Sequence, residues 1–79
     1  MGKAGKALKQ VLDAHGITQY KLASVMGISR SNVHRWIYEV ADPTGDAILE
    51  IRDALQRIDA AAAERFTELY WSDFEAKEQ

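Results

Sequence analysis

Apolar residues recur at steps of three and four along the whole chain, and no stretch shows the strict alternation of a half-buried strand. This pattern predicts an all-α protein with five helices. The first helix should end near His15, because Gly16 suits the left-handed conformation that often follows a helix. Its apolar stripe consists of Ala4, Ala7, Leu8, Val11 and Leu12.

A second and a third helix are predicted on either side of Gly27, which can take the positive φ that a short turn requires. Thr18 is placed to cap the second helix with its hydroxyl, and Ser29 is placed to cap the third. Ala23 is small where the two helices are expected to cross. The residues expected to face inward here are Leu22, Ala23, Met26, Ile28, Val33, Trp36 and Ile37.

The segment Asp42-Pro43-Thr44 holds the one proline of the chain and separates the third helix from a fourth, for which Thr44 is a suitable cap. A fifth helix is expected from about residue 59 or 60 to about residue 76. The apolar residues of the fourth helix are Ile48, Leu49, Ile51, Ala54, Leu55 and Ile58. With 79 residues and no linker-like stretch, residues 1–79 are predicted to form a single domain.

Charge divides the chain into two halves, although the net charge is only −2. Residues 1–41 carry six basic and two acidic side chains, whereas residues 42–79 carry four basic and ten acidic ones. The N-terminal half therefore has a surplus of +4, which suits an anionic partner, and the C-terminal half has a surplus of −6.

Several classes of site and location are not supported by the sequence. The chain has no cysteine and two histidines, so it offers neither a disulfide nor a zinc-binding spacing, and we expect no metal or cofactor. No combination of nucleophile, base and orienting residue suggests an enzyme. No apolar run approaches the roughly 20 residues of a membrane span, and no signal peptide is indicated. We expect a cytoplasmic protein without membrane contact.

The third helix carries long polar side chains on its outward side. Arg30, Ser31 and His34 face outward near its start, and Arg35 lies one step round the helix. Arginine can donate two parallel hydrogen bonds to the guanine edge in the major groove, while serine and histidine can reach other edges or the backbone. Solvated surface charge is the alternative reading of the two arginines.

The spacing of these residues resembles the helix-turn-helix of phage-repressor-like regulators, the Cro-like or XRE-type family, over roughly residues 4–58. The matching positions are Gln19, Ala23, Gly27, Ser29, Val33 and Trp36. The resemblance implies a lambda-repressor-like domain that binds double-stranded DNA as a transcription regulator. The predicted C-terminal helix, over about residues 59–76, extends beyond the part of the chain that resembles the family. The resemblance further implies that Gln19, Ser29 and Asn32 hold phosphates, that Arg30, Ser31 and Arg35 face bases, and that His34 is more peripheral. The chain departs from the family between residues 39 and 42, where it lacks the usual glycine and basic loop.

The C-terminal helix has more aromatic residues than one face can bury. Phe66, Tyr70 and Phe74 belong to one stripe, whereas Trp71 lies roughly 140° from Phe66 on an α-helix. The stripe could cover the helical body, or one aromatic face could meet a second subunit. We favour a homodimer that binds a palindromic operator, with a tentative interface of Phe66, Tyr70, Trp71 and Phe74. The alternative is a protein-interaction module, such as an antitoxin or adaptor, whose acidic aromatic helix binds a basic partner.

Overall fold

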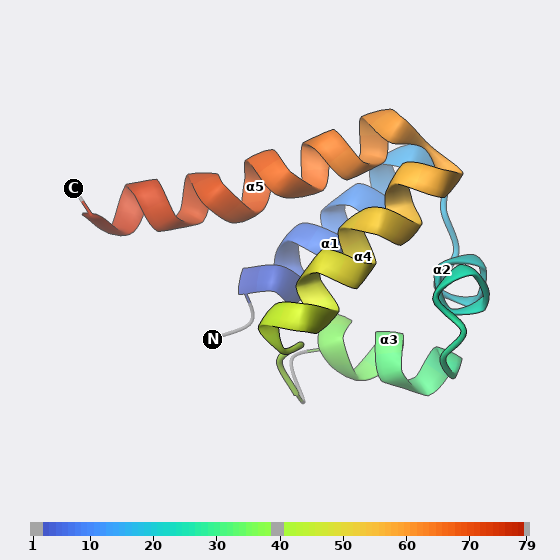
Figure 1. The fold of residues 1–79 in the computed structure, drawn as a ribbon. Coiled ribbons are helices and arrows are strands. Elements are labelled where there is room, and N and C mark those ends of the chain that lie inside the picture. The colour runs from blue at the N-terminus through green and yellow to red at the C-terminus, as the bar shows by residue number, and fades with distance from the viewer. Residues whose placement is uncertain (1–2, 39–40, 79) are drawn as a thin grey trace.

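The structure, a computed structural model, describes residues 3–38 and 41–78, with side chains as far as Ser72. Within these ranges the chain forms five α-helices and no strand, as the hydrophobic pattern predicts (Figure 1). The helices are α1 Lys3–His15, α2 Gln19–Met26, α3 Arg30–Ile37, α4 Gly45–Ile58 and α5 Ala60–Glu78. The expected boundaries of α5 differ from the observed ones by no more than two residues.

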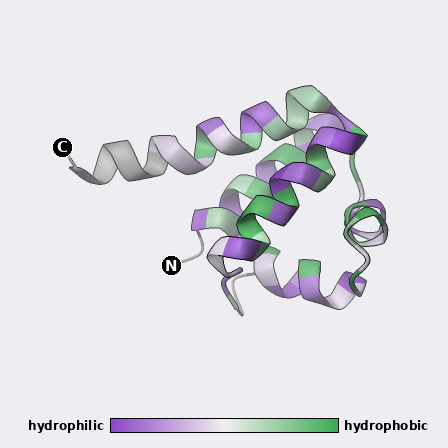
Figure 2. Cartoon of the chain, in the orientation of Figure 1, coloured by the Kyte–Doolittle hydropathy of each residue, from purple (hydrophilic) through white to green (hydrophobic). Residues whose placement is uncertain are grey.

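Helix α5 packs against both α1 and α4 on one side of the core, while α3 packs against α1 and α2 packs against α4 on the other side (Figure 1). Apolar residues recur along α1 and α4 between hydrophilic ones, so each helix has one apolar side (Figure 2). Burying those sides in the shared core removes apolar area from water and supplies most of the driving force for folding. The largest fully buried side chains are Phe66, Leu8, Leu22, Ile51, Leu55, Val11 and Val33.

Two of the three predicted helix caps are present. The hydroxyl of Thr18 accepts a hydrogen bond from the Lys21 N–H at 3.0 Å, and that of Thr44 accepts one from the Ala47 N–H at 3.1 Å. Ser29 precedes α3 with the expected extended backbone but makes no side-chain cap. Its hydroxyl instead lies 2.9 Å from the hydroxyl of Ser31. The prediction that Ser29 caps α3 through its hydroxyl is therefore wrong, because a neighbouring hydroxyl competes for it.

The turn between α2 and α3 closes as the sequence predicts. Gly27 has φ 74°, and its N–H donates to the carbonyl of Ser24 at 3.3 Å. The N–H of Ile28 donates to the carbonyl of Ala23 at 3.0 Å, so the last turn of α2 is satisfied before the chain reverses. This turn fixes the angle at which α3 leaves α2.

A second glycine sets how closely α1 approaches α3. Gly5 is buried inside α1, and a side-chain carbon built on it would lie within 3.0 Å of the backbone oxygen of Trp36. A residue with any side chain would therefore push the two helices apart. The sequence pattern did not single out Gly5.

One apolar residue of the fourth helix lies outside the core. Leu49 fits the predicted helical spacing but is 52% exposed, because it lies about 200° round α4 from the fully buried Ile51. Trp36 packs against the core but is only partly buried. Helix α3 ends at Ile37, while Glu39, part of the departure from the family pattern, lies outside the described residues.

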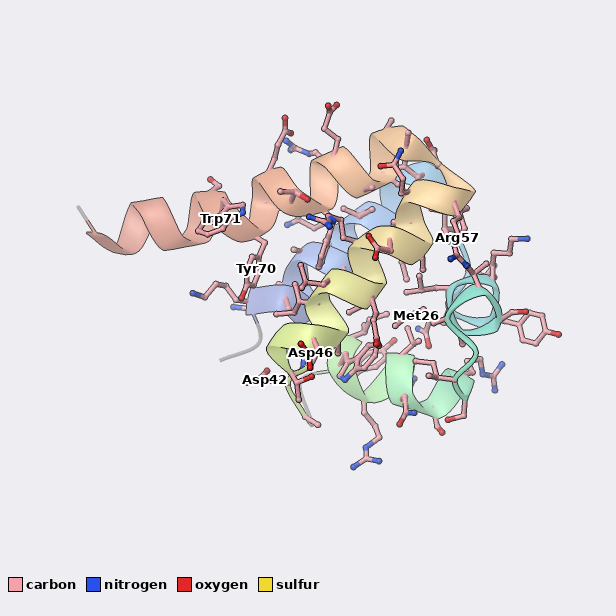
Figure 3. The ribbon with its side chains drawn as sticks, in the orientation of Figure 1. Met26, Asp42, Asp46, Arg57, Tyr70 and Trp71 are labelled. Carbon is pink, nitrogen blue, oxygen red and sulfur yellow. The ribbon has the colours of Figure 1, made fainter. Side chains whose placement is uncertain are left out.

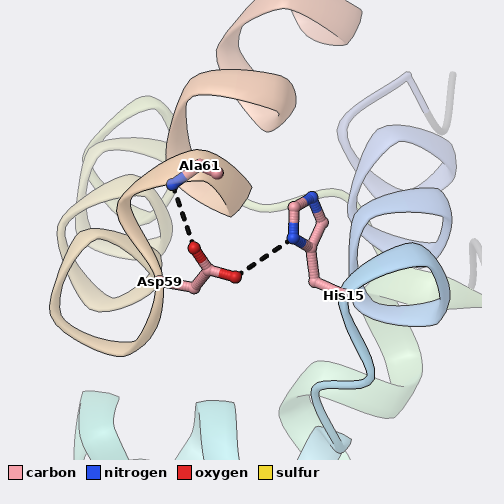
Figure 4. Close-up of polar contacts among 3 residues, drawn as sticks. All are labelled: His15, Asp59 and Ala61. Carbon is pink, nitrogen blue, oxygen red and sulfur yellow. Dashed lines mark hydrogen bonds and ion pairs between the residues drawn. The ribbon is translucent and has the colours of Figure 1, made fainter.

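A polar contact joins the end of α1 to the connection between α4 and α5. Asp59 separates α4 from α5, and its carboxylate accepts a hydrogen bond from the Ala61 N–H at 3.1 Å (Figure 4). Its other oxygen lies 3.1 Å from Nδ1 of His15, the last residue of α1. The sequence marks His15 only as the residue near which the first helix was predicted to end. The structure adds a partner 44 residues away, so this histidine also fastens α1 to the start of α5.

The aromatic residues of α5 divide into buried and exposed ones. Phe66 is 1% exposed in the core of the single chain, so its tentative assignment to a dimer interface is wrong. Tyr70 is half-buried below α5, with Lys3 5.9 Å from its ring centroid (Figure 3). Trp71 is 57% exposed. The Phe74 side chain lies outside the described part of the structure.

None of the helices in the described ranges combines the length and the apolar character needed to cross a membrane.

Candidate functional site

An open groove of about 1060 Å³ lies where the start of α2 meets the outer face of α3. Both helices contribute because the turn at Gly27 brings the first residue of α2 beside α3. The groove is lined by Thr18, Gln19, Tyr20, Ser29, Arg30, Ser31, His34 and Tyr38. These residues come from the start of α2 and from the turn before α3 and its outer face. The fold thus assembles two segments of the chain into one surface.

Five of the seven predicted contact residues line this groove. Gln19 comes from α2, Ser29 from the turn, and Arg30, Ser31 and His34 from α3. All of them except the half-buried Gln19 are exposed. Asn32 and Arg35 are also exposed on α3, but they do not line the groove. The structure therefore brings most of the predicted set together and places these two residues outside it.

Buried side chains behind the groove hold α2 and α3 in place. Leu22 and Val33 are fully buried, and Ala23 is 2% exposed. Because the apolar residues of both helices point into the core, the polar residues between them point outward. Arg30 and His34 are four residues apart on α3 and share its exposed face.

Two tyrosines in the groove were missed by the sequence analysis. Tyr20 is 70% exposed and Tyr38 is 55% exposed, although both are large and partly apolar. The rings of Tyr38 and His34 have centroids 4.4 Å apart and planes inclined at 42°. The exposure of Tyr38 could have been predicted from the sequence, because residues four apart on a helix share a face and His34 was expected to face outward.

The groove offers hydrogen-bond donors and a positive charge to a ligand. Arg30 carries the charge, and the hydroxyls, the Gln19 amide and the His34 imidazole can donate or accept. Among the described residues that line the groove, none is acidic. Metal chemistry has no support in the described part of the chain, where no group of three or more His, Asp or Glu side chains is placed to bind an ion. The arrangement suits an anionic ligand with hydrogen-bonding edges.

Comparison with known proteins agrees with this arrangement of α2 and α3. A family model described as helix-turn-helix matches residues 8–61, which include both helices and the turn. The chain belongs to the helix-turn-helix family. The resemblance to the XRE-type regulators inferred from the sequence is thereby confirmed.

A relative from Methanocaldococcus jannaschii, provisionally named an HTH-type transcriptional regulatory protein, is 41% identical over 51 residues. The matched segment is 65% of this chain and 16% of the relative, so the helix-turn-helix chain spans a small part of that protein's length. No solved structure matches the chain at a significant level.

Proposed function

We propose that this helix-turn-helix chain binds double-stranded DNA as part of a transcription regulator, with the groove between α2 and α3 as its contact surface. Membership of the family and the name of the archaeal relative support the class of function. The groove supports the location, because Arg30 is the one charged residue among the described residues that line it and the others are polar or aromatic. This function requires binding rather than catalysis, and we propose a cytoplasmic location for it.

Base recognition is assigned to the exposed side of α3. The major groove of B-DNA is about 12 Å wide and admits an α-helix. Arg30, at the first position of α3, can donate two parallel bonds to a guanine, and Arg35 extends the reach along the same helix. Ser31 and His34 contact other base edges from within the groove.

Phosphate contacts are assigned to the residues around the helix starts. Gln19 is the first residue of α2, and Ser29 directly precedes α3, where backbone N–H groups point toward an incoming anion. Asn32 is exposed on α3 beyond the groove. Contacts of this kind fix the orientation of the protein on DNA and carry no sequence information themselves.

The observation that carries this proposal is the single surface formed by Gln19 from α2 and Arg30, Ser31 and His34 from α3. Selection of bound sequences from random duplex DNA tests it. We expect an enriched motif. Replacing Arg30 or Arg35 with alanine should cost about 1 to 3 kcal/mol at one base position, if that contact is bidentate. Gln19→Ala should weaken all sequences alike. Absence of enrichment would overturn the proposal.

We further propose that the protein acts as a homodimer on a near-palindromic operator. The support is the exposed Trp71, beside a depression of about 700 Å³ between α4 and α5. The depression is lined by Arg52, Gln56, Ala60, Ala61, Ala63, Glu64, Thr67, Glu68 and Trp71. Tyr70 and Phe74 stay in the proposed interface as neighbours of Trp71 on α5. A dimer should place half-sites about 34 Å apart, one turn of DNA.

A protein-interaction role for α5 is the second candidate. Alanines and the acidic residues Glu64 and Glu68 line the same depression. If this protein acts as an antitoxin or adaptor, a basic helix of its protein partner could occupy the depression. Sedimentation at micromolar concentration separates the two proposals. A dimer that dissociates in the variant Trp71→Ala favours the first, whereas a monomer in both proteins favours the second.

A further inference from the structure

A second, smaller depression continues the proposed DNA groove toward α1. It has a volume of about 210 Å³ and shares three lining residues with the groove, namely Thr18, Gln19 and Tyr38. Its remaining residues are Lys9, Leu12, Asp13, Ile17 and Ile37. The surface that begins on α3 therefore passes over Gln19 and Tyr38 and reaches the outer side of α1.

On the side of α1, the depression is lined by a solvent-exposed ion pair. The Nζ of Lys9 lies 3.2 Å from a carboxylate oxygen of Asp13, one turn further along the helix. Their side chains are 53% and 71% exposed. Exposed pairs of this kind are weak, since water and salt screen them and two long side chains must be held in one geometry. Lys9 can therefore exchange Asp13 for a stronger anion at little cost.

The groove has too few positive side chains to neutralise a DNA backbone, which carries one negative charge per phosphate. Among the described residues that line the groove, Arg30 is the one Lys or Arg. The connection after α3, from Tyr38 to Thr44, has no lysine or arginine in its sequence. Lys9 is the cation that the adjoining depression adds beside Gln19.

We propose that the depression between α1 and Gln19 receives a DNA backbone phosphate, and that Lys9 leaves Asp13 to neutralise it. This inference rests on the proposed DNA-binding function and adds α1 to the contact surface. Lysine acts on phosphate as a mobile point charge, so it needs no fixed geometry before DNA arrives. Asp13 remains in the depression as a negative charge that opposes the phosphate and weakens the binding of every sequence equally.

The salt dependence of affinity tests this assignment directly. Each neutralised phosphate contributes about −0.9 to the slope of log K against log salt concentration on B-DNA. Lys9→Ala should therefore make the slope shallower by about 0.9. Over a fourfold rise in salt, the variant should lose about 3.5-fold less affinity than the wild type. Its base preference should not change. Lys9→Arg should retain the slope, and Asp13→Asn should tighten binding without making the slope shallower.

A matched pair on α5 provides the control. Arg65 lies 3.3 Å from Glu68, and their side chains are 55% and 60% exposed, close to the values for Lys9 and Asp13. Helix α5 lies across the fold from α3 (Figure 1). Arg65→Ala and Glu68→Gln make the same changes in net charge and should leave the slope unaltered. Fluorescence anisotropy with a duplex carrying the selected sequence gives all these affinities, and circular dichroism confirms that each variant is folded.

The outcomes separate the two proposals. If the wild type binds a selected sequence and Lys9→Ala keeps the wild-type slope, the role of Lys9 is wrong while DNA binding stands. The same holds if Arg65→Ala changes the slope as much as Lys9→Ala does. If the wild type binds no duplex, both the DNA-binding function and the role of Lys9 are overturned.

Discussion

Replacing Gly5 with alanine should destabilise the protein, although helix propensity alone predicts the opposite. Alanine is favoured over glycine inside a helix by about 1 kcal/mol. In this fold, however, the new methyl group would overlap the backbone oxygen of Trp36 and lie 3.1 Å from its carbonyl carbon. Both atoms belong to the backbone of α3, so no side chain can rotate away. Overpacking of a well-packed site costs about 1 to 3 kcal/mol. A clash with backbone atoms lies at the upper end of that range, so a net loss of about 2 kcal/mol remains after the gain in propensity.

Thermal and urea unfolding give the measurement. A loss of about 1 kcal/mol lowers the midpoint of a domain this small by about 4 to 8 °C, so a net loss of about 2 kcal/mol in Gly5→Ala should lower it by roughly 8 to 16 °C. Gly45→Ala is the matched control, because nothing lies within 4 Å of a carbon added at that position. Its effect should stay within about 0.5 kcal/mol.

The two substitutions also differ in their expected effect on DNA binding. Gly5→Ala displaces α3 from α1 and should weaken binding of the selected sequence, whereas Gly45→Ala should not. A Gly5→Ala variant with a midpoint at or above that of the wild type would refute the close approach of α1 and α3.

Three further results are expected. Ala23→Leu should cost about 1 to 3 kcal/mol in the free energy of unfolding, because Ala23 is 2% exposed where α2 meets the core; an unchanged midpoint would contradict this packing. Thr44→Ala should cost about 1 kcal/mol, whereas Ser29→Ala should cost clearly less because its hydroxyl caps nothing; equal losses in urea unfolding would contradict the observed caps. Trp71→Ala should convert a dimer to a monomer in sedimentation, and its unfolding midpoint should no longer depend on protein concentration; a variant that stays dimeric would contradict the proposed interface.

Local signals in the sequence were enough to predict the helices and the turn. A cap such as Thr18, a turn glycine such as Gly27 and an apolar stripe each act within a few residues, so the sequence displays them directly. The wrong prediction at Ser29 also has a local cause, because the Ser31 hydroxyl two residues away contacts the Ser29 hydroxyl that was expected to cap α3. Leu49 fitted the helical spacing but lies on the far side of α4, where an apolar residue need not be buried.

Contacts between distant segments could not be predicted in this way. The role of Gly5 depends on Trp36, and that of His15 depends on Asp59, each more than 30 residues away. Nothing in the spacing around either residue indicates its partner. The same limit applied to the candidate site: the residues of α3 were identified from its outward face, whereas the nearness of Lys9 to Gln19 needed the packing of α1.

The corner at Asp59 gives the molecule a pivot. From there α5 runs for 19 residues, or about 27 Å at 1.5 Å per residue, so a tilt of about 5° at the corner moves its far end by roughly 2 Å. His15 and the Ala61 N–H hold Asp59 from two sides, while the buried Ala62, Ala63 and Phe66 hold α5 against the core. In the proposed dimer, α5 fixes the distance between the two copies of α3. Residue 15 is absent from the groove, yet it would contribute to the operator spacing that the protein accepts.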